Sequence, residues 1–213
     1  KVEETNAWLA ATPDSVLQNL SDTTPPSSPK QKTIRYRAEN VHDFGWFADK
    51  NFHVQSGSVA LESGKTVKTW TAFTNAEAHL WKDALHYVNR SVAFYSDLVG
   101  EYPWPQATAV QSALSAGGGM EYPMITIIGL ADNARDLDEV ITHEVGHNWF
   151  YGILATNERD HAWMDEGINT YYENRYMAQH YPPEELAQIP EFFIKGSEMD
   201  LWEVARLHQA RRG

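Results

Sequence analysis

His143, Glu144 and His147 lie in the segment His-Glu-Val-Gly-His, whose spacing is typical of a catalytic zinc helix. Because an α-helix has 3.6 residues per turn, side chains four residues apart share one face, and two imidazoles can bind one metal ion. The glutamate between them can act as a general base on a water beside the metal. Glu166 follows nineteen residues after His147 and offers a third ligand, which leaves the fourth position to water. These residues predict a catalytic site with one Zn²⁺ per chain.

The residues around the motif predict the helix that must carry it. Asp136 with Glu139 three residues later has the pattern of a helix start, and Gly152 is a helix stop, so we expect a helix over residues 137–151. The two histidines share a helical stripe with apolar residues. That stripe is expected to face inward, where buried histidines need polar partners such as a metal ion.

A second helical pattern runs from Gly167 to His180, directly after Glu166. A carboxylate at the start of this helix is well placed to complete the metal site. Glu173 lies seven residues after Glu166 on the same helix face, where it can hydrogen-bond a metal-binding histidine. A surface carboxylate is the alternative interpretation of Glu173.

Gly117 to Gly119 precede Met120 and Glu121 in a segment with little side-chain bulk. The segment lacks the Lys-Ser/Thr of a phosphate-binding loop, and it is either a flexible turn or bare backbone that a peptide can approach closely. The strand expected over residues 124–128 is interpreted as an edge strand that could bind a peptide by strand addition. Glu121 would then lie at the end of the substrate channel.

The composition limits the partners and the compartment. The 213 residues include 17 basic and 29 acidic side chains, a net charge of −12, which argues against nucleic acid because phosphate binding needs a basic surface. There is no cysteine, so disulfides and thiolate chemistry are excluded. No apolar run reaches the ~18 residues of a membrane span, so no transmembrane segment is expected. Export and a cytoplasmic location both stay open, since the chain does not contain an N-terminal signal region.

Periodicity along the chain predicts strands first and helices later. Residues 23–30 are a Pro- and Ser-rich loop, short strands follow, and a long helix is predicted over Ala76–Val99. The predicted strands are Thr33–Ala38, Phe44–Ala48, Phe52–Gln55, Ser58–Leu61, Val67–Phe73, Ala107–Leu114 and Met124–Ile128, and a last helix is predicted over Ile189–Arg211. Mixed strands and helices from residue 75 predict an α+β domain.

Three motifs, in this order, resemble those of the M1 family of zinc aminopeptidases. They are Gly118 to Tyr122 (the Gly-x-Met-Glu-Asn motif), His143 to His147 (the metal helix) and Trp163 to Gly167 (the third-ligand segment). Tyr102 to Pro105 and Val41 to Trp46 also resemble segments of that family, so the resemblance covers roughly residues 33 to 200. The combination is far more specific than any one motif.

The resemblance implies a fold and a division of the chain. The fold is α+β, a thermolysin-like zincin core of the gluzincin type, with a mixed sheet plus helices, preceded by the C-terminal strands of a β-sandwich domain. Residues 1–74 would be the C-terminal part of that β-domain, and residues 75–213 the N-terminal part of the zinc metallopeptidase domain.

The resemblance also implies roles for the site residues. The chain would hydrolyse the first peptide bond of peptides with a free N-terminus. Glu144 would be the general base, and Glu121 would hold the free amino group. The implied zinc ligands are His143, His147 and Glu166, and the implied substrate-binding residues beside Glu121 are Gly118, Gly119 and Met120.

The chain departs from the family pattern in three ways. Tyr122 replaces the Asn that follows Met-Glu, and Asp165 replaces the Asn before the ligand Glu166. The tyrosine that stabilises the oxyanion in the family is expected beyond Gly213. We therefore expect a fragment that lacks other domains of a longer enzyme and is less active on its own.

Two other functions stay open. A zinc endopeptidase of the thermolysin type would share the metal site and need no anchor for an amine. A zinc- or peptide-binding module without activity would need no base at Glu144. The presence of Glu144 favours an enzyme, and the presence of Glu121 favours an aminopeptidase.

Overall fold

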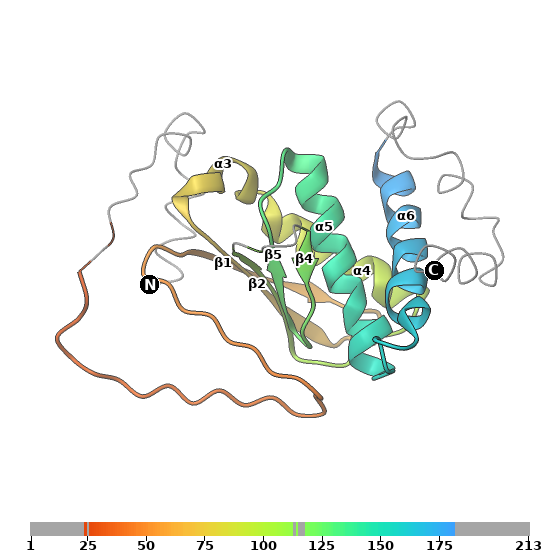
Figure 1. Ribbon diagram of the computed structural model, residues 1–213, viewed down its shortest axis with the longest axis horizontal. Coiled ribbons are helices and arrows are strands. Elements are labelled where there is room, and N and C mark those ends of the chain that lie inside the picture. Colours follow the sequence, from red (N-terminus) through yellow and green to blue (C-terminus); the bar gives the residue numbers. More distant parts are fainter. Residues whose placement is uncertain (1–23, 25, 113, 115–117, 182–213) are drawn as a thin grey trace.

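The computed structural model describes residues 24, 26–112, 114 and 118–181, and the helix predicted over 189–211 lies outside them. In this part of the chain, helices pack against one face of a 5-stranded sheet (Figure 1). The strands are β1 (His53–Ala60), β2 (Thr66–Phe73), β3 (Gln106–Gln111), β4 (Gly119–Met120) and β5 (Ile125–Ile128). The mixed sheet and its helices confirm the predicted α+β class.

The strand order is β1-β2-β3-β5-β4. β1 is antiparallel to β2, β2 and β3 are parallel, β3 and β5 are parallel, and β4 is antiparallel to β5. The prediction that Met124 to Ile128 forms an edge strand is therefore wrong, because β4 pairs with β5 on its outer side: Gly119 lies opposite Ile128, and Met120 opposite Ile127. The edge beside the metal helix is β4.

The sheet crosses the boundary that was predicted between residues 74 and 75. β1 and β2 were expected in a separate β-domain, yet Lys68 to Ala72 pair with Gln106 to Val110 in the same sheet. A division at residue 74 would separate paired strands. β1 and β2 therefore belong with the sheet that carries the site, and the division of the remaining chain into domains stays a prediction.

The strands predicted over Thr33–Ala38 and Phe44–Ala48 are absent, since residues 26–52 contain no strand. An alternating pattern gives a strand only when a neighbouring strand pairs with its backbone groups, and none of the described strands pairs with this segment. Instead, the segment runs extended beside the sheet, with Ile34 and Tyr36 more than half exposed (Figure 1). An apolar cavity of about 420 Å³ separates part of the segment from the sheet.

Two further predictions change in detail. The strands expected over Phe52–Gln55 and Ser58–Leu61 are one strand, β1, because Gly57 keeps its pairing with Thr69. A Cβ at Gly57 would be 3.3 Å from Leu85, so the absent side chain lets a helix pack closely here. The helix expected over Ala76–Val99 is interrupted at residues 82 and 83. It forms η1 (Asn75–Glu77), α3 (Ala78–Trp81) and α4 (Ala84–Leu98).

The metal helix α5 (Ala134–His147) begins three residues before its predicted start. Asn133 is the N-cap, and its side chain accepts a hydrogen bond of 3.0 Å from the backbone N–H of Asp136. Asp136 in turn accepts a bond of 2.9 Å from the N–H of Asp132. α5 continues into a π-helix, η2 (Asn148–Ile153). A second π-helix, η3 (Trp163–Gly167), leads into α6 (Ile168–His180).

A buried carboxylate locks the three long helices together. Asp138 on α5 is fully buried and accepts hydrogen bonds from Arg90 on α4, from Tyr176 on α6 (2.8 Å) and from Tyr181 just after α6 (2.6 Å). Gly146 permits the close approach of these helices, because a Cβ there would overlap Asn169 and Tyr95. The packing fixes the position of α5 relative to α6.

None of the helices in the described ranges is long and apolar enough to cross a membrane.

Candidate metal centre

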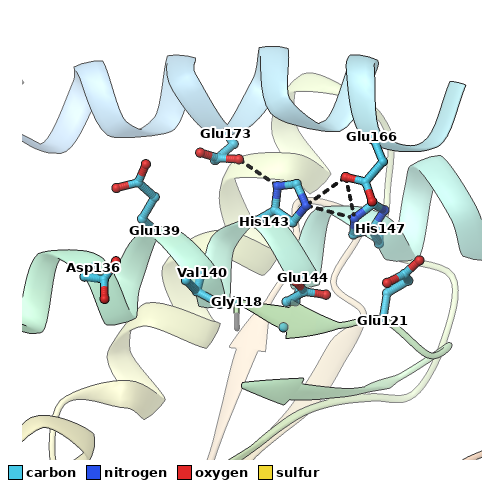
Figure 2. A pocket seen from close by; sticks show the side chains of 11 residues that line it. Gly118, Glu121, Asp136, Glu139, Val140, His143, Glu144, His147, Glu166 and Glu173 are labelled. Atoms are coloured by element: carbon cyan, nitrogen blue, oxygen red, sulfur yellow. Dashed lines mark hydrogen bonds and ion pairs between the residues drawn. The ribbon is translucent and has the colours of Figure 1, made fainter. Parts of the chain in front are cut away.

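The structure brings His143 and His147 of α5 together with Glu166 of η3. The Nε2 atoms of the two histidines are 3.0 Å apart, and Glu166 Oε2 lies 3.2 Å from His143 Nε2 and 3.7 Å from His147 Nε2 (Figure 2). Three ligands bound tetrahedrally to Zn²⁺ at ~2.0–2.1 Å lie about 3.3 Å from one another. The three atoms are thus spaced as the corners of one zinc tetrahedron, and the residues fit the ion.

Carboxylates behind the imidazoles support the same conclusion. His143 Nδ1 is 2.7 Å from Glu173 Oε2, and His147 Nδ1 is 2.6 Å from Asp165 Oδ1, although the second contact is not aligned as a hydrogen bond. Protons held at the two Nδ1 atoms leave the Nε2 lone pairs facing each other at 3.0 Å. Both lone pairs are then available to bind one metal ion.

The pKa values of the two histidines also indicate that their surroundings favour a positive charge. Burial lowers the pKa of His143, but Glu166 and Glu173 outweigh it, so that the net pKa lies well above its ordinary value. Burial also lowers the pKa of His147, and Asp165 again reverses the direction. The surroundings favour positive charge at this point.

Glu144 lies beside the ligand atoms on α5 and is 5% exposed. Its Oε2 atom is buried and has no hydrogen-bond partner in the described part of the chain. Burial raises the pKa of Glu144 to about 7, while the charges of His143 and His147 oppose the rise. An unpaired carboxylate with this pKa is suited to accept and return a proton near neutral pH.

Gly119 of β4 fits directly against Glu144. A Cβ at residue 119 would overlap the carboxylate and the Cγ of Glu144. Gly118 has a φ of +68°, which favours glycine, and its carbonyl accepts a bond of 2.7 Å from the N–H of Gly129. The glycines predicted to present bare backbone therefore bring an edge strand against the candidate base. Met120 completes this edge beside them.

A cavity of about 400 Å³ lies in front of these groups. Glu121 stands at one end of the view in Figure 2, Asp136 and Glu139 at the other, and the metal-binding residues between them. The lining residues are Gly118, Gly119, Glu121, Asp136, Glu139, Val140, His143, Glu144, His147, Glu166 and Glu173. All predicted site residues except Met120 line this one cavity.

Glu121 is 8% exposed and has a ligand atom within 4.8 Å of both Glu144 and His147. Burial raises its pKa, and the charge of His147 lowers it. Glu121 also forms a cluster with Glu158 and Asp165, whose ligand atoms again lie within 4.8 Å of one another. This end of the cavity is strongly acidic, and it suits a cationic group.

Sequence reasoning missed the contacts of three residues. Asp165 was considered only as a substitution of the family Asn, and Asn169, which donates a bond of 2.7 Å to the carbonyl of His143, was not considered. Glu158 was not considered either. The position of Asp165 directly before a ligand was an available signal, because neighbouring residues of a metal ligand often support other ligands. No local pattern points to Glu158, which comes to Glu121 only through the fold.

Comparison with known proteins identifies the family. The family model for the Peptidase family M1 domain matches residues 83–207, more than half of the chain. The chain belongs to peptidase family M1. The resemblance of its three motifs to this family is thereby confirmed.

Two relatives with aminopeptidase names are similar to the chain. The chain is 33% identical over 85 residues to leucine aminopeptidase 2-1 of Meyerozyma guilliermondii, a match that covers 38% of this chain and 14% of the relative. It is 26% identical over 133 residues to aminopeptidase Q of Mus musculus, covering 57% of this chain and 24% of the relative. The chain thus spans a quarter or less of the length of these two relatives.

One solved structure shows the fold. The chain resembles Legionella pneumophila aminopeptidase A, solved in complex with aspartic acid, with a TM-score of 0.50 and 14% identity. The match covers 61% of this chain and 17% of that chain. The likeness confirms the predicted thermolysin-like core of an M1 peptidase.

Proposed function

We propose that this chain carries the catalytic centre of a zinc-dependent aminopeptidase, which hydrolyses the first peptide bond of peptides with a free N-terminus. The observation that carries the proposal is the tetrahedral spacing of His143, His147 and Glu166, with Glu144 and Glu121 in the same cavity. Membership of family M1 supports it.

One Zn²⁺ per chain, held by His143, His147 and Glu166, would polarise the substrate carbonyl and lower the pKa of water to about 7. Glu144 takes a proton from the attacking water and returns it to the leaving amine, a role that its unpaired Oε2 and its pKa of about 7 support. Glu173 and Asp165 hold the histidine rings in orientation. Gly118 and the edge strand β4, which consists of Gly119 and Met120, present their backbone to the peptide.

Glu121 favours an aminopeptidase over an endopeptidase. Its carboxylate is buried at one end of the cavity, where the ammonium of a free N-terminus compensates its charge. A peptide continuing past this point would place a neutral amide there instead, and the buried charge would stay uncompensated. The second alternative, a binding module without activity, would have no use for a buried unpaired carboxylate at Glu144.

The test compares Glu121→Gln with the unaltered, zinc-loaded protein on a free-amine peptide and on its N-acetylated form. We expect hydrolysis of the free-amine peptide, little hydrolysis of the acetylated one, and a loss of kcat/KM on the order of 10- to 100-fold on the free-amine peptide alone. Zinc content, measured by mass spectrometry, should be one ion per chain for both proteins. Equal activity of the unaltered protein on both peptides would contradict the aminopeptidase assignment and favour an endopeptidase. No hydrolysis at full zinc loading would favour the binding module.

A further inference from the structure

Asn148 directly follows the second metal-binding histidine, and its buried side chain joins two segments that are distant in the sequence. Its Nδ2 donates a bond of 2.9 Å to the carbonyl of Val145 in the metal helix. Its Oδ1 accepts a bond of 2.9 Å from the backbone N–H of Met124 and one of 3.1 Å from the hydroxyl of Tyr102. The side chain therefore ties the metal helix to the segment just before β5.

The segment that Asn148 contacts is a tight turn with a strained residue. The backbone N–H of Ile125 closes the turn with a bond of 3.2 Å to the carbonyl of Tyr122. Pro123 occupies the second position, and Met124 occupies the third with a φ of +69°. These are the features of a type II turn, whose third residue is usually glycine because a side chain is strained at positive φ. Contacts outside the turn must therefore hold Met124 in this conformation.

Asn148 supplies one of these contacts. The N–H of the third residue is not bonded within a type II turn, and a buried N–H without an acceptor is costly. Oδ1 of Asn148 accepts this hydrogen bond from Met124. The carbonyl of Met124 accepts a bond of 2.9 Å from the N–H of Thr108, just across on β3. The strained residue is thus bonded on two sides, to the sheet and to the metal helix.

The turn determines where Glu121 lies. Glu121 follows β4 and directly precedes the turn. On the β4 side, the carbonyl of Met120 accepts a bond of 3.1 Å from the hydroxyl of Thr126. On the other side, the turn fixes the direction in which the chain leaves Glu121. A carboxylate oxygen of Glu121 lies within 4.8 Å of a ligand atom of His147, so even a small shift of the turn changes the position of Glu121 relative to the metal-binding atoms.

From these contacts, and on the basis of the proposed function, we infer that Asn148 is a positioning residue. It holds the turn after Glu121 against the metal helix and thereby sets the distance between the carboxylate that binds the substrate amine and the atoms that bind zinc. This distance decides whether the amine and the first carbonyl of one substrate can be bound at the same time. Loss of Asn148 should therefore weaken ligands that use both groups and spare ligands that use the metal alone.

The test measures the affinity of two metal-binding inhibitors that differ only in the amine. Leucine hydroxamate and 4-methylpentanohydroxamate share the hydroxamate and the side chain, and only the first has an α-amino group. Asn148→Ser removes the acceptor of the Met124 N–H, while the shorter hydroxyl can still bond to the carbonyl of Val145 in its own helix. At one zinc ion per chain, calorimetry should show the Kd of leucine hydroxamate raised by about 10-fold and the Kd of 4-methylpentanohydroxamate unchanged.

Two further variants test the reason for this effect. Glycine adopts a positive φ without strain, so Asn148→Ser should raise the Kd of leucine hydroxamate by less in a Met124→Gly background than in the unaltered protein. Asn148→Asp keeps an acceptor at the same place and should bind leucine hydroxamate at least as tightly as the unaltered protein does. It provides a second test if Asn148→Ser does not fold, because a rise in this Kd alone would contradict the role of the acceptor.

Asn169→Ser is the matched control. Asn169 is also buried and also bonds a carbonyl of the metal helix, that of His143 at 2.7 Å, but it lies on α6. It should change the Kd of the two inhibitors by the same factor. In Asn148→Ser, an unchanged Kd for leucine hydroxamate, an equal rise for both inhibitors, or an effect that Met124→Gly does not reduce would each overturn the inference and leave the proposed function standing. Equal binding of both inhibitors by the unaltered protein would contradict the proposed function, and the inference with it.

Discussion

The carboxylates behind the two histidines differ from the carboxylates that face the cavity. Behind the rings, Glu173 and Asp165 lie 2.7 and 2.6 Å from the Nδ1 atoms of His143 and His147. In front of the rings, Glu144 is buried and its Oε2 has no partner in the part of the chain described. The carboxylates behind the rings stabilise the orientation of the two histidines. The carboxylate that faces the cavity is available to water and substrate. Substitutions behind the rings should therefore lower zinc affinity, and substitutions in front of the rings should lower kcat.

The largest effect is expected from Glu144→Gln. The amide keeps the shape of the side chain and cannot accept a proton from water, so kcat should fall on the order of 10² to 10⁴-fold. Zinc affinity should change by no more than a few-fold, because Glu144 is not one of the three residues expected to bind the zinc ion. Steady-state kinetics and zinc titration measure the two quantities on the same sample. A fall in zinc affinity as large as the fall in kcat would contradict the distinction between the carboxylates behind the histidine rings and those that face the cavity.

A smaller loss is expected from Gly119→Ala, which moves Glu144 without changing it. The added Cβ overlaps the carboxylate, and displacing a catalytic group by ~1 Å can cost up to 10²-fold in rate. kcat should fall on the order of 10-fold to 100-fold at unchanged zinc content. Gly64→Ala is the control, since residue 64 has open space around it and a φ of +87°. It should reduce stability through backbone strain and leave kcat alone.

Glu173→Gln tests the carboxylates behind the rings. The loss of this negative charge beside His143 Nδ1 should weaken zinc binding by about 10- to 100-fold, while kcat at saturating zinc changes little. Competition with a chelator of known affinity measures the first, and kinetics in excess zinc the second. A large drop in kcat at full zinc occupancy would instead indicate that Glu173 acts on turnover, as Glu144 is expected to do.

The smallest effect is expected from Glu139→Gln, and it concerns stability. Burial and the charge of Glu173 raise the pKa of Glu139 to about 7, against an ordinary 4.5, while Arg135 lowers it. The folded protein thus holds this proton more tightly than the unfolded chain, so stability falls as pH rises from 4.5 through 7. Glu139→Gln should raise Tm at pH 8 by about 2 to 4 °C per ~1 kcal/mol regained and leave it unchanged at pH 4. A uniform shift at both pH values would contradict this account.

Much of the site could be predicted because its signals are local. His143, Glu144 and His147 depend on helical periodicity alone, and Glu173 falls on the face that meets His143 because it lies two helical turns after Glu166. The start of the metal helix was predicted at the wrong residue. Asn133 caps this helix instead of Asp136, because its side chain accepts a hydrogen bond from a free N–H group of the first turn.

The rest depends on pairings between distant segments. The strand order could not be predicted, so the edge was assigned to residues 124–128 and the alternation over 33–48 was interpreted as strands. The approach of Glu158 to Glu121 is likewise a property of the fold, as 37 residues separate them along the chain. Asp165 and Glu166 both face the histidines because they are adjacent in a π-helix, which no periodicity of 3.6 anticipates.

The π-helices η2 and η3 make this site sensitive to chain length. A π turn closes between residues five apart, so it holds one residue more than an α turn. Deleting one residue from η3 would restore the α-helix and turn the end that carries Glu166 by about 100° away from the two histidines. Related sequences should therefore keep a constant length within each π-helix.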